Sequence, residues 1–183
     1  MPTDEAVLAA TRRWLERAVI GLNLCPFARA VHSKGQVHFA VSAADSSPQV
    51  LHDLLRELDA LVASDPQERD TTLLVVPRCL ELFLDFNRLV ARAERTIRKK
   101  GLEGVIQLAS FHPDYCFSDA NDDDVANFSN RSPYPTLHLL RESSIDKAVR
   151  AFPNAESIYG ANADALRRLG AAGWAALDVG PVR

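Results

Sequence analysis

The sequence has few cysteines, and their spacing excludes the usual structural uses of this residue. Only three are present, Cys25, Cys79 and Cys116, and none forms a CxxC pair. An odd number of well-separated cysteines predicts neither a disulfide framework nor a structural zinc site. Any function of a cysteine here is therefore that of a free thiol.

Long apolar runs and an excess of basic residues are also absent. No run approaches the roughly 18 to 20 apolar residues of a membrane span, and Asp4 and Glu5 stand where a secretory signal carries positive charge. The formal net charge is −3, whereas nucleic acids and anionic membranes are bound by dense basic surfaces. We therefore expect a cytoplasmic protein that binds neither nucleic acid nor a membrane.

Glycine-rich phosphate loops are missing as well. The eight glycines form neither a GxGxxG nor a GxxxxGK[ST] pattern, so a standard nucleotide-binding fold is not supported. What is present is a composition of 47% hydrophobic and 25% charged residues, which is typical of one well-cored domain. No linker or repeat divides the chain, and we expect a single domain over residues 1–183, with 171–183 as a loosely held tail.

Apolar spacing predicts helices that alternate with short strands. Helical periodicity indicates longer helices at about 3–22, 47–62, 80–100, 143–152 and 154–169, with Ser143 or Ser144 as the cap of the fourth. Short apolar runs bounded by turn residues indicate strands at 37–41, 71–77, 104–111 and 136–142. Pro48 suits a first helical turn, the cations at 95–100 suit a last turn, and Gly101 suits the residue beyond it.

The order of these elements predicts the fold class. Strands that alternate with helices of about ten or more residues imply βαβ crossovers, which place the first three strands roughly parallel with helices packed on the sheet. The last strand follows a connection without an obvious helix, so it can pair antiparallel with the third. We predict an α/β domain with a mixed sheet of about four strands.

The connection at residues 111–134 is the strongest candidate for a functional site. Loops longer than about 12 to 15 residues are uncommon in compact domains and are often functional. This one begins beside His112, directly after the third strand, and open α/β sheets bind ligands beyond the carboxyl ends of their parallel strands. A guanidinium beside amides and hydroxyls suits a carboxylate or phosphate. The predicted substrate-binding residues are Asn127, Asn130, Arg131, Ser132, Tyr134 and His138.

The same residues also have a structural interpretation. Arg131 can pair with one of the acidic residues at 122–124, while the asparagines bond to their own backbone in turns. Phe128 and Tyr134 would also suit a protein interface. The sequence leaves these alternatives open.

Cys25 is the candidate nucleophile. If Pro26 begins a short helix, the Cys25 thiol is its N-cap and ionises more easily near the positive end of the helix dipole. Paired with His112 as general acid or base, such a thiol could carry out acyl or alkyl transfer. The alternative is a small buried hydrophobic residue between Leu24 and Phe27.

A metal site is a further alternative. His112, His138 and a carboxylate from residues 119–124 could bind a divalent cation that activates a water molecule. The spacing matches no recognised ligand motif, so we assign no metal ligand and do not favour a divalent metal.

Four blocks of the sequence together carry a resemblance to a known family. They are VIGLNLCPFA (19–28), IQLASFHPDYCF (106–117), NFSNRSPYP (127–135) and LHLLRE (137–142). With these blocks the chain resembles an uncharacterised bacterial family catalogued as a domain of unknown function. The resemblance extends from about residue 4 to about residue 170 and implies a stand-alone cytoplasmic protein, without implying an activity, a cofactor or a catalytic residue.

The leading hypothesis from the sequence is an enzyme, a hydrolase or group transferase, that acts on a small anionic metabolite at the 111–138 loop. Arg131, Asn130 and Ser132 would hold the anion, and His112 would act as general acid or base. The alternatives are a non-catalytic ligand-binding or protein-interaction module that uses the same loop, and a metal-dependent hydrolase.

Overall fold

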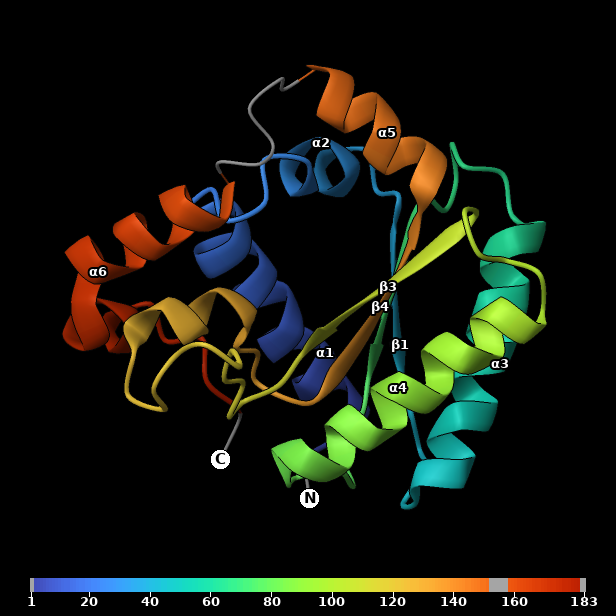
Figure 1. The fold of residues 1–183 in the computed structure, drawn as a ribbon, viewed down its shortest axis with the longest axis horizontal. Helices are drawn as coiled ribbons and strands as arrows, with labels where there is room; N and C mark the ends of the chain where they lie inside the picture. Colours follow the sequence, from blue (N-terminus) through green and yellow to red (C-terminus); the bar gives the residue numbers. More distant parts are fainter. Residues whose placement is uncertain (1, 152–157, 182–183) are drawn as a thin grey trace.

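The fold is built around one open sheet of four strands (Figure 1). The computed structural model describes residues 2–151 and 158–181. The strands are β1 (Val37–Val41), β2 (Thr71–Val75), β3 (Ile106–Phe111) and β4 (Thr136–Arg141), in the spatial order β1-β2-β4-β3. β1 runs parallel to β2, and β4 runs antiparallel to both β2 and β3. The predicted mixed α/β sheet is confirmed.

β4 lies inside the sheet although it is the last strand of the chain. Every residue of β2 is buried, and Leu137 and Leu139 of β4 are fully buried, as expected for strands covered on both faces. The sequence predicts the antiparallel pairing of β4 with β3, but it does not predict that β4 separates β3 from β2.

Helices α3 (Ser47–Ala63) and α4 (Phe83–Lys99) cover one face of the sheet. Their apolar positions recur at helical spacing and pack on the side chains of β2 and β4 that point to this face. Pro48 occupies the first turn of α3, Arg98 and Lys99 occupy the last turn of α4, and Gly101 follows with φ +71°. The main core residues here are Leu54, Leu58, Leu74, Phe86, Leu89, Leu137 and Leu139.

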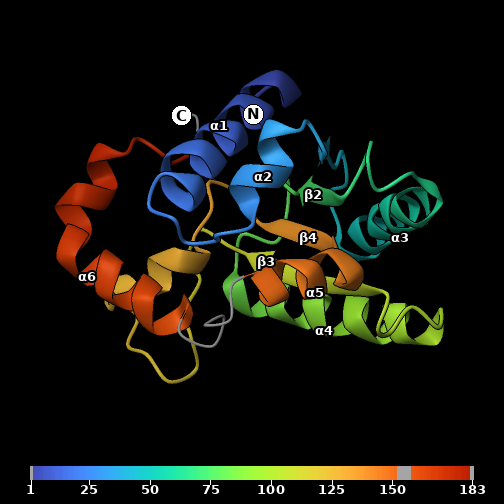
Figure 2. The same ribbon diagram turned by 90° about the horizontal axis from the view of Figure 1, so that it is seen from above.

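The opposite face is covered by the N-terminal helices. α1 (Asp4–Trp14) continues into a π-helical segment η1 (Leu15–Ile20), and α2 (Ala28–Ser33) follows. Figure 2 shows α1 and α2 on one side of the strands and α4 on the other. α5 (Glu142–Ala151) follows β4 directly and lies at the end of the sheet near α2 (Figure 1).

The C-terminal helix packs on the connection between β3 and β4. This connection contains a 3-10 helix, η2 (Val125–Asn130), which contacts α6 (Ile158–Ala176). Residues 171–181, predicted to be loosely held, are packed against the domain. The Trp174 ring lies 5.1 Å from that of Phe128, and Arg13 donates a 2.6 Å hydrogen bond to the Asp178 carbonyl. The reason is that Gly170 adopts φ +70°, which breaks the helix and turns the chain back toward α1.

Three helix boundaries differ from the sequence prediction. α2 begins at Ala28 and not at Pro26, α4 begins at Phe83 and not at residue 80, and α5 begins at Glu142, ahead of both predicted capping serines. The predicted end at Phe152 and start at 154 lie outside the described residues. Within residues 2–151 and 158–181, no helix is long and apolar enough to cross a membrane.

Candidate functional site

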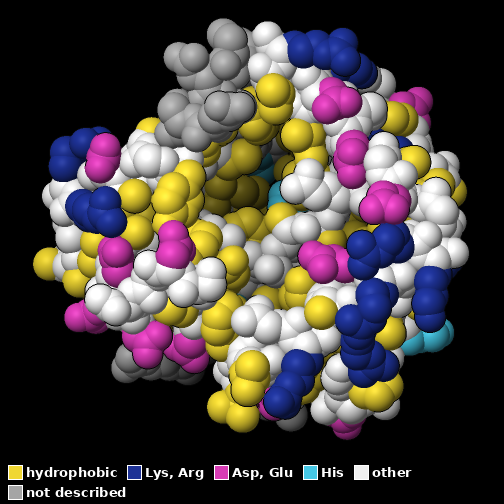
Figure 3. Space-filling view, in the orientation of Figure 1, with side chains coloured by type: hydrophobic (Ala, Val, Ile, Leu, Met, Phe, Trp, Pro, Cys, Tyr) yellow, Lys and Arg dark blue, Asp and Glu magenta, His cyan; other side chains and the backbone are white. Residues whose placement is uncertain are grey.

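A cavity of about 540 Å³ opens over the sheet face that α1 and α2 cover. Figure 3 shows it as a hollow with a mostly hydrophobic lining. The sheet forms its floor, and η1, α2 and α5 contribute its walls. The larger apolar side chains that line it are Trp14, Leu15, Phe27, Leu73, Phe111, Leu140 and Ile145.

Small side chains explain why this face is not filled. Ala28 and Ala30 of α2, Ala109 of β3 and Ala148 of α5 all line the cavity. No side chain of α2 is fully buried, so this short helix borders the sheet without packing tightly onto it. The cavity is therefore a consequence of the residue sizes on three elements that surround it.

The position of the cavity differs from the predicted one. Gln36 and Val37 line it where β1 begins, and Asp70 and Thr71 line it where β2 begins. These are the amino ends of the parallel strands, whereas the sequence predicts a site at their carboxyl ends. The difference arises because β4 runs antiparallel to β2, so the carboxyl end of β4 lies beside the amino end of β2. α5 follows β4 directly and closes the cavity at this end of the sheet.

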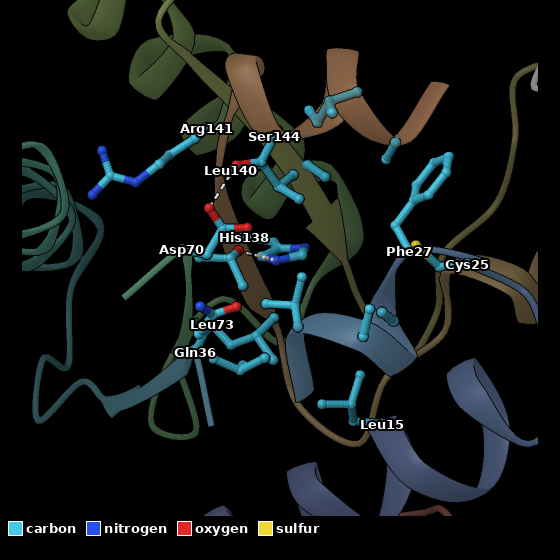
Figure 4. A pocket seen from close by; sticks show the side chains of 18 of the residues that line it. Leu15, Cys25, Phe27, Gln36, Asp70, Leu73, His138, Leu140, Arg141 and Ser144 are labelled. Carbon is cyan, nitrogen blue, oxygen red and sulfur yellow. Dashed lines mark hydrogen bonds between the residues drawn. The ribbon is translucent and has the colours of Figure 1, made fainter. Parts of the chain in front are cut away.

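His138 is the central polar group of the cavity floor (Figure 4). Leu137 and Leu139 point into the core under α3 and α4, so His138 between them points to the opposite face. It pairs with Leu73 of β2 on one side and with Ala109 of β3 on the other. The ring is partly accessible, but only from within the cavity, and burial lowers its pKa to about 4. The imidazole is therefore neutral at physiological pH.

Thr71 fixes which nitrogen of this imidazole carries the proton. The Thr71 hydroxyl donates a 2.7 Å hydrogen bond to the Leu139 carbonyl, and its oxygen also lies 2.5 Å from His138 Nε2. A hydroxyl has one proton, so the second bond forms only if Nε2–H donates to Thr71 Oγ1. This arrangement leaves His138 Nδ1 as an unprotonated acceptor.

Three further polar side chains, those of Asp70, Arg141 and Ser144, lie at the side of the cavity. Ser144 of α5 donates a 2.6 Å hydrogen bond to Asp70 Oδ1, which ties α5 to the start of β2 (Figure 4). Arg141 points away from the cavity and donates to the carbonyls of Leu61, Ser64 and Arg69, where it caps the end of α3. The Arg141 guanidinium therefore stabilises the fold.

The predicted anion-binding residue Arg131 is engaged by its own loop. Its side chain donates to the carbonyls of Tyr115 and Asp122 at 3.3 and 3.0 Å. The guanidinium also lies 4.7 Å from the centre of the Phe128 ring. Neither predicted alternative describes this arrangement, because the partners are backbone carbonyls and not carboxylates or a ligand.

The other predicted binding residues of the loop also bond to the backbone. Asn127 is fully buried, accepts from the Phe117 amide and donates to the Asn121 carbonyl. Asn130 donates to the Ser110 carbonyl, and Ser132 donates to the Tyr134 carbonyl at 2.6 Å. The Tyr134 side chain is buried against Val7, Ala10 and Val75. Of the predicted binding set, only His138 lines the cavity.

His112 lies in the core on the α4 side. It is fully buried, and its ring contacts those of Phe83 and Phe86 at 5.3 and 5.2 Å. Nδ1 accepts a hydrogen bond from the Asp114 amide, so Nε2 carries the proton and donates to the Leu80 carbonyl. Burial lowers the pKa of this imidazole as well. Both ring nitrogens are occupied, which leaves neither available for proton transfer to a substrate.

Cys25 lines the cavity, but its environment does not activate it. α2 begins three residues later, so Cys25 is not the N-cap of that helix. Burial raises the pKa of the thiol, and hydrogen bonds from the amides of Phe27 and Ala28 offset only part of this effect. The thiol packs in the cluster around Trp14, on the opposite side of the sheet from His112. The predicted pair of Cys25 with His112 is therefore not formed.

The predicted metal set is not brought together either. His138 faces the cavity, while His112 is enclosed by α4 and by the start of the loop. No group of three or more histidine, cysteine, aspartate or glutamate side chains that could hold a metal occurs in the described part of the chain. Residues 2–151 and 158–181 therefore provide no ligand set for the metal-dependent alternative.

Sequence reasoning missed Thr71, Asp70 and Ser144. A polar side chain between apolar neighbours on a strand marks His138, but Thr71 lies between Asp70 and Thr72, so this signal does not single it out. Asp70 and Ser144 lie at element ends that meet only when β4 enters the sheet beside β2. Their contact is long-range and leaves no local pattern.

The chain belongs to the family described as Protein of unknown function (DUF1415), whose model matches residues 6–176. This confirms the family predicted from the four sequence blocks as one of unknown function. No curated protein and no solved structure matches the chain.

Proposed function

We propose that this protein binds a small, largely apolar molecule in the cavity over the sheet. The cavity volume of about 540 Å³ falls within the range of small-molecule sites, which is roughly 300 to 1,000 Å³. Its lining joins apolar side chains to one central neutral imidazole, and such sites combine apolar walls with a few placed polar groups. Release of water from these walls provides the driving force for binding.

The observation that carries this proposal is the position of His138. A histidine on the buried face of a central strand normally packs against other side chains, but this one borders open space. The shape and polarity of the lining favour a ligand over a protein surface, because a concave site encloses a small molecule and a flat patch does not.

The proposal changes the site predicted from the sequence and keeps one of the predicted classes. The enzyme predicted from the sequence would use Arg131 as a free cation and Cys25 as an activated nucleophile. Arg131 is engaged by backbone carbonyls, and the pKa of Cys25 is raised. We therefore favour the non-catalytic ligand-binding class, at the cavity and not at the 111–138 loop.

The test uses the fluorescent apolar probe 1-aminoanthracene and two matched variants. Ala109 lies on the cavity floor beside His138, so Ala109→Leu places a larger side chain in the space a ligand needs. Ala161 is exposed on α6, and Ala161→Leu makes the same chemical change away from the cavity.

We expect saturable binding of one probe per chain, weakened about tenfold or more by Ala109→Leu and unchanged by Ala161→Leu. Equal binding by both variants, or no saturable binding by the wild-type protein, would contradict the proposal.

A further inference from the structure

The floor of the cavity offers a ligand an acceptor and not a donor. Because Thr71 holds the proton on His138 Nε2, the other ring nitrogen has a free lone pair. His138 Nδ1 forms no hydrogen bond with another described residue, and Figure 4 shows it directed into the cavity. The one fully buried side-chain nitrogen or oxygen without a partner in the described part of the chain is Arg141 Nε, so Nδ1 is not sealed by protein.

Asp70 also offers an acceptor to the cavity. Asp70 is 9% exposed, and Ser144 donates to one of its two carboxylate oxygens. The second oxygen can only accept a hydrogen bond while the carboxylate is ionised. The cations that line the cavity, Lys34 and Lys147, are exposed on α2's end and on α5, and form no ion pair with a described residue. Gln36 also lines the cavity and is 7% exposed, but its side-chain amide nitrogen donates to the Gln67 carbonyl. The cations thus lie at the outside of the cavity, and the acceptors of His138 and Asp70 lie inside.

An apolar molecule with no donor would leave His138 Nδ1 unsatisfied. Filling the cavity excludes water from this nitrogen, and an unpaired polar group in an apolar site is unfavourable. A ligand that donates a hydrogen bond to it avoids this cost. Sites of this kind discriminate strongly against analogues that lack the donor.

We infer that the ligand carries a neutral hydrogen-bond donor, a hydroxyl or an N–H group, at its inner end, and that His138 Nδ1 accepts from it. This inference rests on the proposed function. Thr71 acts as a positioning residue, because it fixes the proton on Nε2 and so keeps Nδ1 an acceptor. A purely hydrocarbon molecule of the same shape binds more weakly, and so does one whose inner group only accepts hydrogen bonds.

The test compares 2-naphthol with 2-methoxynaphthalene, which has a similar shape but no donor. Both are titrated against the complex of the full chain with 1-aminoanthracene, and displacement gives their affinities. We expect 2-naphthol to bind about five- to tenfold more tightly to the wild-type protein, which is the effect of one net hydrogen bond. In His138→Leu the two probes should bind equally.

The outcomes separate this inference from the proposed function. If 1-aminoanthracene shows no saturable binding to the wild-type protein, the cavity is not a ligand site and both statements fail. If both bind equally to the wild-type protein, or if the preference persists in His138→Leu, the cavity binds ligands but His138 does not select a donor.

A second variant and a ligand-free readout avoid dependence on the folding of His138→Leu. In Thr71→Val the proton is no longer held on Nε2, so the preference for 2-naphthol should decrease. In the wild-type protein, nitrogen NMR of the imidazole ring should show Nε2 protonated and Nδ1 unprotonated at neutral pH. A proton on Nδ1 would overturn the inference.

Discussion

His138 Nε2 lies 2.5 Å from Thr71 Oγ1, and this contact joins the cavity floor to the pairing of β2 with β4. Thr71 pairs with Leu140 and His138 pairs with Leu73, so the bond crosses the two strands diagonally. The imidazole is therefore positioned by the sheet and not by a loop. A group held in this way keeps its orientation without a ligand, which lowers the entropic cost of binding.

The stability of the protein should depend on His138 at acidic pH. Its pKa is about 4 in the folded protein, below the usual value near 6.5 in an unfolded chain. The unfolded state therefore takes up a proton first, and the contribution to stability is complete above about pH 6.5 and is lost as the pH falls toward 4. We expect His138 to lower the free energy of unfolding by about 2 kcal/mol between about pH 8 and pH 5.

Urea unfolding of the wild-type protein and of His138→Leu at both pH values measures this contribution. The pKa values of His38 and His112 are also lowered by burial, but these residues are present in both proteins and cancel in the comparison. The variant should lose less stability on acidification than the wild type. An identical pH dependence would mean that the His138 pKa is not lowered.

His112→Ala should be a stability variant. The change removes a fully buried ring, the hydrogen bond that it donates to the Leu80 carbonyl and the hydrogen bond that it accepts from the Asp114 amide. We expect a loss of about 2 to 4 kcal/mol in the free energy of unfolding, with unchanged affinity for 1-aminoanthracene at a temperature where the variant is folded. Chemical denaturation and a binding titration check both parts. A stable variant that no longer binds the probe would place His112 in the site after all.

The two histidines show what the sequence could and could not predict. Strand alternation correctly predicts that His138 points away from Leu137 and Leu139, because side-chain direction in a strand is a local property. His112 has an equally favourable place after a strand, yet Phe83 and Phe86 from α4 enclose it. That packing depends on residues far apart in the sequence, so no local pattern distinguishes the two histidines.

Cys25 should react slowly with iodoacetamide in the folded protein. Its pKa is raised by burial, so little thiolate forms at neutral pH. Because the thiol lines the cavity, bound 1-aminoanthracene should slow the reaction further, while His112→Ala should not change the apparent pKa.

Cys79 is the internal control for this experiment. Burial also raises its pKa, but it packs in the core between α3 and α4 and does not line the cavity. Its alkylation rate, read by peptide mass spectrometry in the same samples, should not respond to the probe. A Cys25 thiol with a pKa below the free value of about 8.5 would restore the thiol mechanism predicted from the sequence.

Arg131→Ala should loosen the connection between β3 and β4. The guanidinium holds the carbonyls of Tyr115 and Asp122 and stacks on Phe128, so its removal frees acceptors at several points of the loop. We expect a loss of about 1 to 3 kcal/mol in unfolding free energy and faster proteolysis within residues 112–131. Arg131→Lys keeps the charge but not the planar fork and should resemble alanine. Full rescue by lysine would indicate that charge, and not geometry, is what matters.

The loop also shows why polar residues in turns are ambiguous. Asn127, Asn130, Ser132 and Arg131 have the chemistry of a ligand site, and in the structure they satisfy backbone groups of a connection that lacks strands. Turn-forming and ligand-binding residues are of the same types, so composition cannot separate them. The cavity exists because small side chains, chiefly alanines of α2, β3 and α5, surround the same space. These three elements are far apart in the sequence, so no single segment predicts the cavity.

The most direct test of the central claim is an NMR titration of alanine-methyl-labelled protein with 1-aminoanthracene. The cavity is lined by Ala28, Ala30, Ala109 and Ala148, whereas Ala161 is exposed on α6. We predict that the four lining methyl groups shift with one shared dissociation constant and that Ala161 does not shift. Shifts confined to other alanines, or none at saturating probe, would contradict a ligand site in this cavity.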